Sequence, residues 1–340
     1  MSNEKTAKKK VGEIIVEKFL EQVDKEGIMP WQRPYNRYSA FNWMTLTQYR
    51  GINRIILPMG EYLTMNQMIS YNKKHGTNYR YDGHGLWWSV VFFKRDEKIA
   101  YDKEVENLIG SSDFDEFKDT YPNGVFKDGW FFYHNDTYKS VCKRRNILRY
   151  TNVTDRTSFV DEERGVLPSR IEVGDVEITR FKPKEIFDNY IEREHLKVRE
   201  MTDDVPCYIQ ALDRIDLNMA PKSEDYFWSY AFHEAAHSTG ARKRLDRDLF
   251  KYFDSKEFDS TSEEYRNLYS IEECIAEIAS SMVCSECDIV DFNTSECDVY
   301  KNNLAYVNAY KKRIKDWGDS FIYIAHQAEL AYERIMGDAI

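Results

Sequence analysis

The stretch FHEAAHSTG, from Phe232 to Gly240, carries two histidines four residues apart and decides what fold the chain can have. Residues four apart on a helix lie one turn above each other on the same face, so His233 and His237 can bind one metal ion. Glu234 follows the first ligand directly, where it can accept a proton from a water at the metal. The spacing therefore predicts a metal-hydrolase helix with Glu234 as catalytic general base.

The surrounding residues favour a helix of about four turns. Ser223 with two acids after it is typical of a helix N-terminus, and Gly240 is expected to end the helix in a left-handed conformation. Aromatic and apolar residues fill the stretch 226–232 nearly all round, which predicts a buried central helix.

A tetrahedral catalytic zinc needs a third protein ligand, and residues 270–284 offer one. The apolar residues of this stretch form one helical stripe, while Glu273 and Glu277 lie on the opposite face with small residues between them. We predict Glu273 as the ligand and Glu277 as the carboxylate that orients a ligating imidazole, although the order could be reversed. The preceding residues 250–269 are polar and are expected to form a loop.

Composition and charge suggest a cytoplasmic protein with a basic and an acidic half. No apolar run approaches the length of a membrane span, and the first twenty residues alternate charged with apolar residues, unlike a signal peptide. Residues 1–158 hold 25 Lys and Arg against 20 Asp and Glu, whereas the remainder holds 23 against 38. This asymmetry fits a basic binding module joined to an acidic catalytic or regulatory module.

Aromatic residues alternate with arginines and asparagines in residues 31–43, which is the composition of a platform for single-stranded DNA. A dense basic cluster further on could hold phosphates. An equally open interpretation is that the aromatics form core and the arginines its rim. The candidate DNA-binding residues are Trp31, Arg33, Arg37, Trp43, Tyr49, Arg50, Asn53, Lys143, Arg144 and Arg145.

The boundary between the two modules is expected in residues 159–180, which hold charge, Pro and Gly without a helical period. We therefore divide the chain into residues 1–160 and 161–340.

Several motifs together resemble the ArdC-type antirestriction proteins of conjugative plasmids and phages. They are MPW at 29–31, YRGIN at 49–53, LRYTNV at 148–153, HEAAHSTG at 233–240 and EECIAE at 272–277. The resemblance implies an α+β chain with an N-terminal single-stranded-DNA-binding domain and a C-terminal zincin-like metallopeptidase domain. It also implies a role in protecting incoming plasmid or phage DNA from host restriction.

Two alternatives remain open at this point. The chain could coat DNA and use Zn2+ only to hold its second domain together, or it could be a metalloprotease that acts on a host protein. A catalytic zinc keeps an open coordination position, so four protein ligands would favour the structural alternative.

Overall fold

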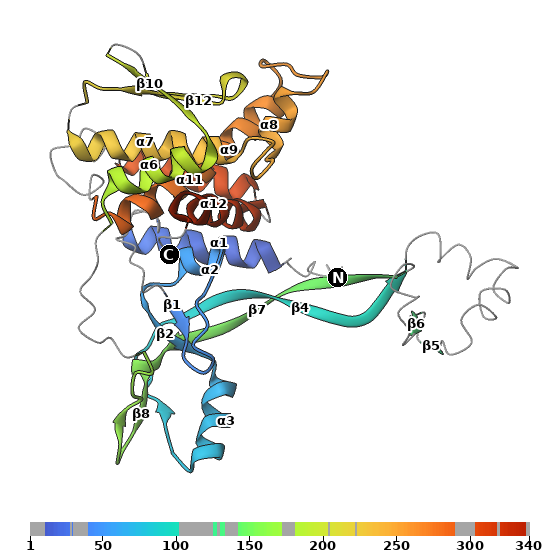
Figure 1. Ribbon diagram of the computed structural model, residues 1–340. Helices are drawn as coiled ribbons and strands as arrows, with labels where there is room; N and C mark the ends of the chain where they lie inside the picture. The colour runs from blue at the N-terminus through green and yellow to red at the C-terminus, as the bar shows by residue number, and fades with distance from the viewer. Residues whose placement is uncertain are drawn as a thin grey trace, which may run out of the picture. The chain divides into compact units, whose positions relative to one another are not determined.

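The computed structural model describes residues 11–27, 29, 40–101, 125–127, 130–132, 142–171, 181–202, 205–221, 223–289, 303–317 and 320–337. Helices and strands are mixed along these ranges, and the strands form several small sheets (Figure 1). The predicted α+β class is confirmed. Among the described helices, none is both long and apolar enough to cross a membrane.

The elements follow one another in this order: α1 (Val11–Glu26), β1 (Ala40–Asn42), α2 (Ile52–Ile56), β2 (Gly60–Leu63), α3 (Met65–His75), β3 (Arg80–Tyr81), β4 (Trp87–Tyr101), β5 (Val125–Lys127), β6 (Trp130–Phe132), β7 (Cys142–Asp155), η3 (Arg156–Ser158), β8 (Phe159–Asp161), β9 (Gly165–Val166), α6 (Pro183–Glu194), β10 (Lys197–Met201), β11 (Cys207–Ile209), η4 (Gln210–Leu212), β12 (Arg214–Asn218), α7 (Glu224–Thr239), α8 (Asp248–Phe253), α9 (Glu263–Glu286), α11 (Asn303–Trp317) and α12 (Ser320–Met336).

The chain forms two compact units. Met1–Val90 and Asn152–Ile340 make up the first, and Val91–Thr151 makes up the second, which contains the antiparallel pair β5 and β6. These two units are defined by the contacts within each of them. The boundary at residue 160 instead divides the chain by expected function, and it stays a prediction. The candidate metal centre lies wholly in the first unit.

The N-terminal part of the first unit is organised by β2 and α3. β2 pairs in parallel with β1 and antiparallel with β7, and Thr64 directly after β2 begins α3. The Thr64 side chain accepts the N–H of Gln67 while the Gln67 side chain accepts the N–H of Thr64, which satisfies two backbone donors at the helix start. Gly76 ends the helix with φ 64, a conformation that glycine adopts without strain.

The C-terminal part is built around α7. Ser223 accepts the N–H of Tyr226 at 3.1 Å, as the predicted N-terminus requires. The three-stranded sheet of order β10-β12-β11 packs along α7 (Figure 1). The helices α6, α9 and α12 also pack against α7. Ala231, Ala235 and Ala236 have no exposed surface. The helix is therefore the buried central element that its composition predicted.

The expected left-handed end of this helix is wrong. Gly240 has φ −72, an ordinary right-handed conformation. Glycine is needed here for space, because a Cβ at this position would lie 2.2 Å from Phe250 Cε2 and 2.7 Å from Arg247 Nη2. The chain after α7 thus folds back tightly onto the helix end.

The predicted loop at residues 250–269 is also wrong. α9 begins at Glu263 rather than Ser270, since Ser262 accepts the N–H of Tyr265 at 3.0 Å and two acids occupy the first turn. α8 occupies the start of the same stretch. The polar residues of this stretch belong to the end of α8, the start of α9 and the short connection between these two helices.

The loop with the YRGIN sequence contacts the C-terminal helices. Gly51 has φ 58, and its N–H donates to Glu329 of α12 at 2.7 Å. Arg54 is buried and lies 3.7 Å from a carboxylate oxygen of Glu286, at the end of α9. These contacts connect the N-terminal loop to α12 and to the end of α9.

Candidate metal centre

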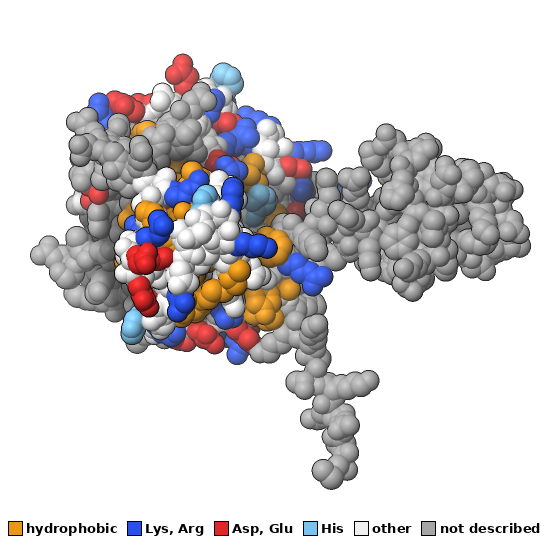
Figure 2. Space-filling model, turned by 90° about the horizontal axis from the view of Figure 1, so that it is seen from below, with side chains coloured by type: hydrophobic (Ala, Val, Ile, Leu, Met, Phe, Trp, Pro, Cys, Tyr) orange, Lys and Arg blue, Asp and Glu red, His pale blue; other side chains and the backbone are white. Residues whose placement is uncertain are grey.

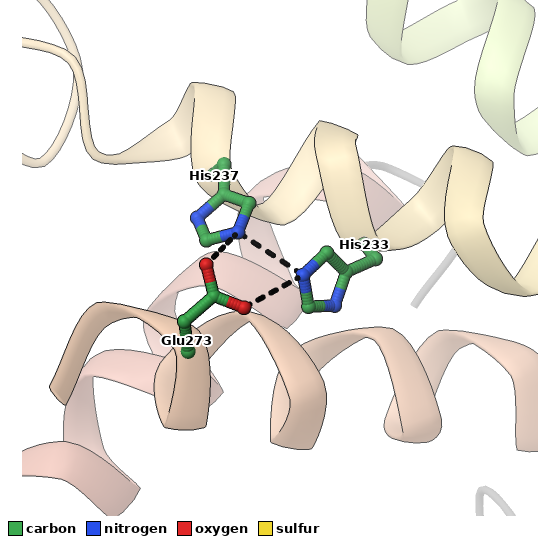
Figure 3. Close-up of side chains that lie close together, drawn as sticks. All are labelled: His233, His237 and Glu273. Carbon is green, nitrogen blue, oxygen red and sulfur yellow. Dashed lines mark hydrogen bonds and ion pairs between the residues drawn. The ribbon is translucent and has the colours of Figure 1, made fainter. Parts of the chain in front are cut away.

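His233 and His237 of α7 and Glu273 of α9 point toward one another (Figure 3). The two imidazole Nε2 atoms are 3.1 Å apart. Carboxylate oxygens of Glu273 lie 3.5 Å from Nε2 of His233 and 3.4 Å from Nε2 of His237. Close packing of α7 on α9 therefore brings together the three residues that the sequence singled out as ligands.

This triangle has the size that a tetrahedral metal needs. With bonds of about 2.0–2.1 Å and tetrahedral angles, neighbouring ligand atoms lie about 3.3 Å apart. The two Nε2 atoms are 3.1 Å apart, and Glu273 places Oε2 at 3.5 Å from His233 and Oε1 at 3.4 Å from His237, so each contact is close to that value although the carboxylate faces the two rings with different oxygens. Two imidazole nitrogens and one carboxylate form a donor set for a divalent metal, and they leave the fourth position for another ligand.

His237 is oriented by a carboxylate that the sequence analysis did not assign. Its Nδ1 donates to Glu272 Oε1 at 3.1 Å, so Nε2 is directed to the metal position. Glu272 in turn accepts from Arg247, whose Nε lies 2.7 Å from Oε2 and whose side chain is 2% exposed. The side chain of Arg247 also donates to Thr239 Oγ1 and to the carbonyl of Ala236. The buried arginine thus fixes both the carboxylate and the end of α7.

His233 has a second carboxylate behind it. Glu277 Oε2 lies 3.8 Å from Nδ1 of His233, on the side of the ring away from His237. This is the place expected of an orienting carboxylate, with Glu273 rather than Glu277 facing both Nε2 atoms. The structure thus favours the order of roles that we predicted over the reverse order.

Glu234 is buried beside the two histidines. Its Oε2 accepts the N–H of Tyr208, in the edge strand β11, at 2.7 Å. Burial raises the pKa of the Glu234 carboxyl, and the charges of His237 and His233 oppose that shift. A carboxyl held in this way is suited to take up and release a proton.

The histidines and carboxylates of the site shift one another's pKa values. Burial opposes protonation of His237, but hydrogen bonds to Glu272 and Glu273 outweigh it and raise the pKa of His237 to about 10. Burial would raise the pKa of Glu273, but hydrogen bonds from the two histidines hold it well below its usual range. Tyr269 lies one turn before Glu273 on α9, and burial and the nearby Glu273 carboxylate raise the pKa of its hydroxyl. Without a metal, a protonated His237 thus supplies the positive charge among these carboxylates.

The candidate DNA-binding residues do not gather in one described place. Trp31, Arg33 and Arg37 lie outside the described residues, and Lys143, Arg144 and Arg145 lie in β7, where only the backbone is described. Tyr49 is half-buried against Tyr62, and Asn53 is half-buried in α2. The exposed Arg50 pairs with Glu333 at 3.0 Å.

The expectation that Trp43 is an exposed ring on which a base could stack is wrong. It is 1% exposed and packs in a core with Leu63, Met68 and Phe159. Its indole N–H donates to the carbonyl of Pro168 at 2.9 Å. A buried ring with a satisfied donor offers no face to a base, because its hydrophobic surface already stabilises the fold.

Exposed apolar and basic side chains occur on α3, on β3 and around the start of β4. Exposed apolar side chains include Ile69 on α3 and Leu86 and Trp87 around the start of β4, and Trp87 is 38% exposed. Lys73, Lys74 and Arg80 are exposed on α3 and β3. Seen from below, hydrophobic and basic side chains lie side by side on the molecule (Figure 2). In the sequence, the adjacent pair Trp87-Trp88 marks this part of the chain.

Residues 185–320 match the family model of zincin-like metallopeptidases. The chain is 27% identical over 297 residues to DNA primase TraC of Escherichia coli, covering 83% of this chain and 17% of the primase. It is 35% identical over 63 residues to the uncharacterized protein y4eC of Sinorhizobium fredii, covering 18% of this chain and 17% of that protein. The chain thus spans about a sixth of the length of the curated relatives it matches.

Two crystal structures of the antirestriction protein ArdC from plasmid R388 are similar to the chain over its length. One is metal-free and the other contains Mn(II). Each aligns with a TM-score of 0.58 at 18% identity, covering 97% of this chain and 98% of ArdC. The chain has the fold of an ArdC-type protein with a zincin-like domain at residues 185–320, and the resemblance seen in the sequence is confirmed for the fold.

Proposed function

We propose that this chain, which has the fold of ArdC, is an antirestriction protein that binds single-stranded DNA and carries a zinc peptidase site. It would act in the cytoplasm of a host cell and protect incoming plasmid or phage DNA from restriction. The observation that carries the proposal is the trio His233, His237 and Glu273, with a carboxylate behind each imidazole.

Zinc is the metal that this donor set fits best. Two imidazoles and one carboxylate with a free fourth position are the ligands of catalytic zinc in several peptidases. The ArdC of plasmid R388 has been crystallised with Mn(II), so the same fold accepts another divalent metal. A bound zinc would polarise a substrate carbonyl and make a water more acidic.

The residues of the chain would perform the remaining steps of amide hydrolysis. Glu234 takes the proton of the attacking water and passes it to the leaving amine, while the Tyr208 N–H holds its Oε2 in place. Glu272 and Glu277 keep both imidazoles oriented. Arg247 keeps Glu272 ionised beside His237, since the charge of Arg247 lowers the pKa of Glu272 against the effect of burial.

Two observations support a catalytic rather than a purely structural metal. Within the described residues, the cluster that could hold a metal contains three protein ligands and not four. Glu234 lies buried among them without being one of the three. A structural site would fill the fourth position and would not need a base.

Single-stranded DNA binding is assigned to residues 1–160, and the peptidase site to residues 161–340. The fold of ArdC and the DNA primase among the relatives support an interaction with DNA. The basic balance of the first half and the face with Trp87, Lys73 and Arg80 support its location. The peptide substrate would be a segment of a host protein.

One purified sample tests both parts. We expect about one zinc per chain by mass spectrometry and binding of a single-stranded oligonucleotide in preference to duplex. On a single strand each neutralised phosphate contributes a slope of about −0.7 in log affinity against log salt. A site with four such contacts should lose roughly a hundred-fold in affinity from about 50 to 250 mM salt. A slope near zero would contradict the DNA assignment, and absence of metal would contradict the zinc site.

A further inference from the structure

Six aromatic rings form a continuous strip beside the metal centre, which we call the aromatic strip. Its members are Tyr208, Phe250, Phe253, Phe258, Tyr265 and Tyr269. The ring centroids are 6.2 Å apart between Tyr208 and Phe250, 6.2 Å between Phe250 and Phe253, 6.1 Å between Phe253 and Tyr265, and 5.8 Å between Tyr265 and Tyr269. Phe258 lies against both Phe253 and Tyr265.

Both ends of the aromatic strip touch the metal machinery. The backbone N–H of Tyr208 donates to Glu234, and Tyr269 lies on the same face of α9 as Glu273, one turn before it. The six rings come from β11, α8, the segment after α8 and the first turns of α9. The strip therefore connects the general base with the carboxylate ligand around one side of the site.

The middle of the strip is accessible and held in place. Phe258, in the middle, is 42% exposed and Tyr269, at one end, is 45% exposed, whereas Phe250 is buried. The Tyr252 hydroxyl accepts the N–H of Asp259 and contacts the carbonyl of Glu257 and the hydroxyl of Ser262, within 3.3 Å in each case. This one hydroxyl fixes the segment that carries Phe258, so the rings are arranged before any ligand binds.

The charges around the strip oppose a nucleic acid. Residues 248–269 hold three Lys and Arg against six Asp and Glu, a net charge of −3. A phosphate backbone would be repelled by this balance, whereas a basic polypeptide would be attracted. Apolar rings within an acidic surround fit a peptide that carries both an apolar side chain and a cation.

We propose that the aromatic strip selects the substrate of the metal centre: a polypeptide with a large apolar or aromatic residue next to the scissile amide and Lys or Arg beside it. The inference rests on the proposed peptidase function. The apolar side chain packs on Phe258 and Tyr269, and its neighbouring amide then lies beside Glu234 and the metal ligands.

The test is peptide binding by the full-length, zinc-loaded Glu234→Gln variant, which is expected to bind without cleaving. Two fluorescent heptapeptides, identical except for Phe-Lys or Ala-Lys at their centre, are compared by anisotropy. Packing one phenyl ring is worth about 1.5–3 kcal/mol, so the Phe peptide should bind at least about ten-fold more tightly. Phe258→Ala should reduce this preference to about two-fold. Phe92→Ala, which removes a ring of similar exposure (44%) from β4, should keep it.

Tyr252→Phe supplies a second variant, since it retains every ring of the strip and releases the segment that carries Phe258. It too should weaken the preference. Equal binding of the two peptides by Glu234→Gln would overturn the inference. So would an oligothymidylate that binds this variant and loses affinity on Phe258→Ala, because the strip would then hold bases. Preferential binding of the Phe peptide together with no cleavage by the unmutated protein would support the strip and refute the peptidase function.

Discussion

Glu272 accepts a hydrogen bond from Nδ1 of His237 at 3.1 Å, and both of its carboxylate oxygens are also bonded to Arg247. All three side chains are buried or nearly so. The contact fixes which nitrogen of His237 carries the proton, so Nε2 faces His233 and Glu273. The metal position thus depends on a charge pair that itself makes no contact with the metal.

Replacing Glu272 should weaken metal binding without removing a ligand. Glu272→Gln leaves His237 in place but loses the anionic acceptor, and such changes cost about 10–100-fold in metal affinity. Zinc affinity is measured by competition with a chelating dye. Glu264→Gln, in the exposed first turn of the same helix, is the matched control and should bind zinc as the unmutated protein does. Equal affinities for the two variants would refute the positioning role.

Loss of either histidine should abolish stoichiometric zinc. His233→Ala and His237→Ala each leave two of the three donors, and the increase in Tm that zinc gives the unmutated protein should disappear. Metal analysis and thermal melts with and without zinc provide the readout. His326→Ala on the exposed side of α12 controls for loss of a histidine as such. A full complement of zinc in both variants would disprove the site.

Glu234→Gln should abolish peptide hydrolysis without affecting metal binding. Glutamine keeps the size of the side chain and can still accept the Tyr208 N–H, but it cannot take a proton. We expect normal zinc content and Tm together with loss of peptide hydrolysis. The same variant is then assayed for antirestriction in cells. Full protection of incoming DNA by this variant would show that protection does not depend on peptidase activity.

Metal and protons should compete for His237. Because its pKa rises from 6.5 to about 10 in the folded metal-free protein, His237 is protonated at pH 7 and must release about one proton when zinc binds. Calorimetry in buffers of different ionisation enthalpy counts that proton. Release of no proton at pH 7 would show that His237 is already neutral.

The same shift has a consequence for the stability of the metal-free protein. A raised folded-state pKa stabilises fully below the unfolded value of 6.5, and this contribution is lost as pH rises through about 10. Between these values the free energy of unfolding should fall with pH by up to about 1.4 kcal/mol per unit. Urea unfolding at several pH values measures the slope, which should be absent in His237→Ala.

Two tryptophans should respond in opposite ways. Trp43→Ala removes a core ring and should lower the free energy of unfolding by about 3–5 kcal/mol. Trp87→Ala removes a partly exposed ring, and should instead lower the affinity for single-stranded DNA by about 1–3 kcal/mol with little dependence on salt. Urea unfolding and oligonucleotide anisotropy distinguish the two effects. Unchanged DNA affinity in Trp87→Ala would remove this face from the proposed DNA site.

The sequence by itself determined the local geometry of the metal centre. The spacing of His233 and His237 and the place of Glu234 follow from the period of one helix, which neighbouring residues of the chain dictate. The acidic helix face narrowed the third ligand to Glu273 or Glu277, and the packing of α9 on α7 brings Glu273 to both Nε2 atoms. These expectations involve at most two elements, so the sequence carries them almost directly.

Tertiary structure alone decided the features that join distant segments. Arg247 and Glu272 are 25 residues apart, and nothing in either neighbourhood marks them as a buried pair behind His237. Trp43 has the sequence surroundings of an exposed ring, yet the carbonyl of Pro168, 125 residues later, accepts its N–H and the core covers it. The aromatic strip likewise draws rings from separate elements. Burial depends on which surfaces meet, and that is a property of the packed chain rather than of any one stretch.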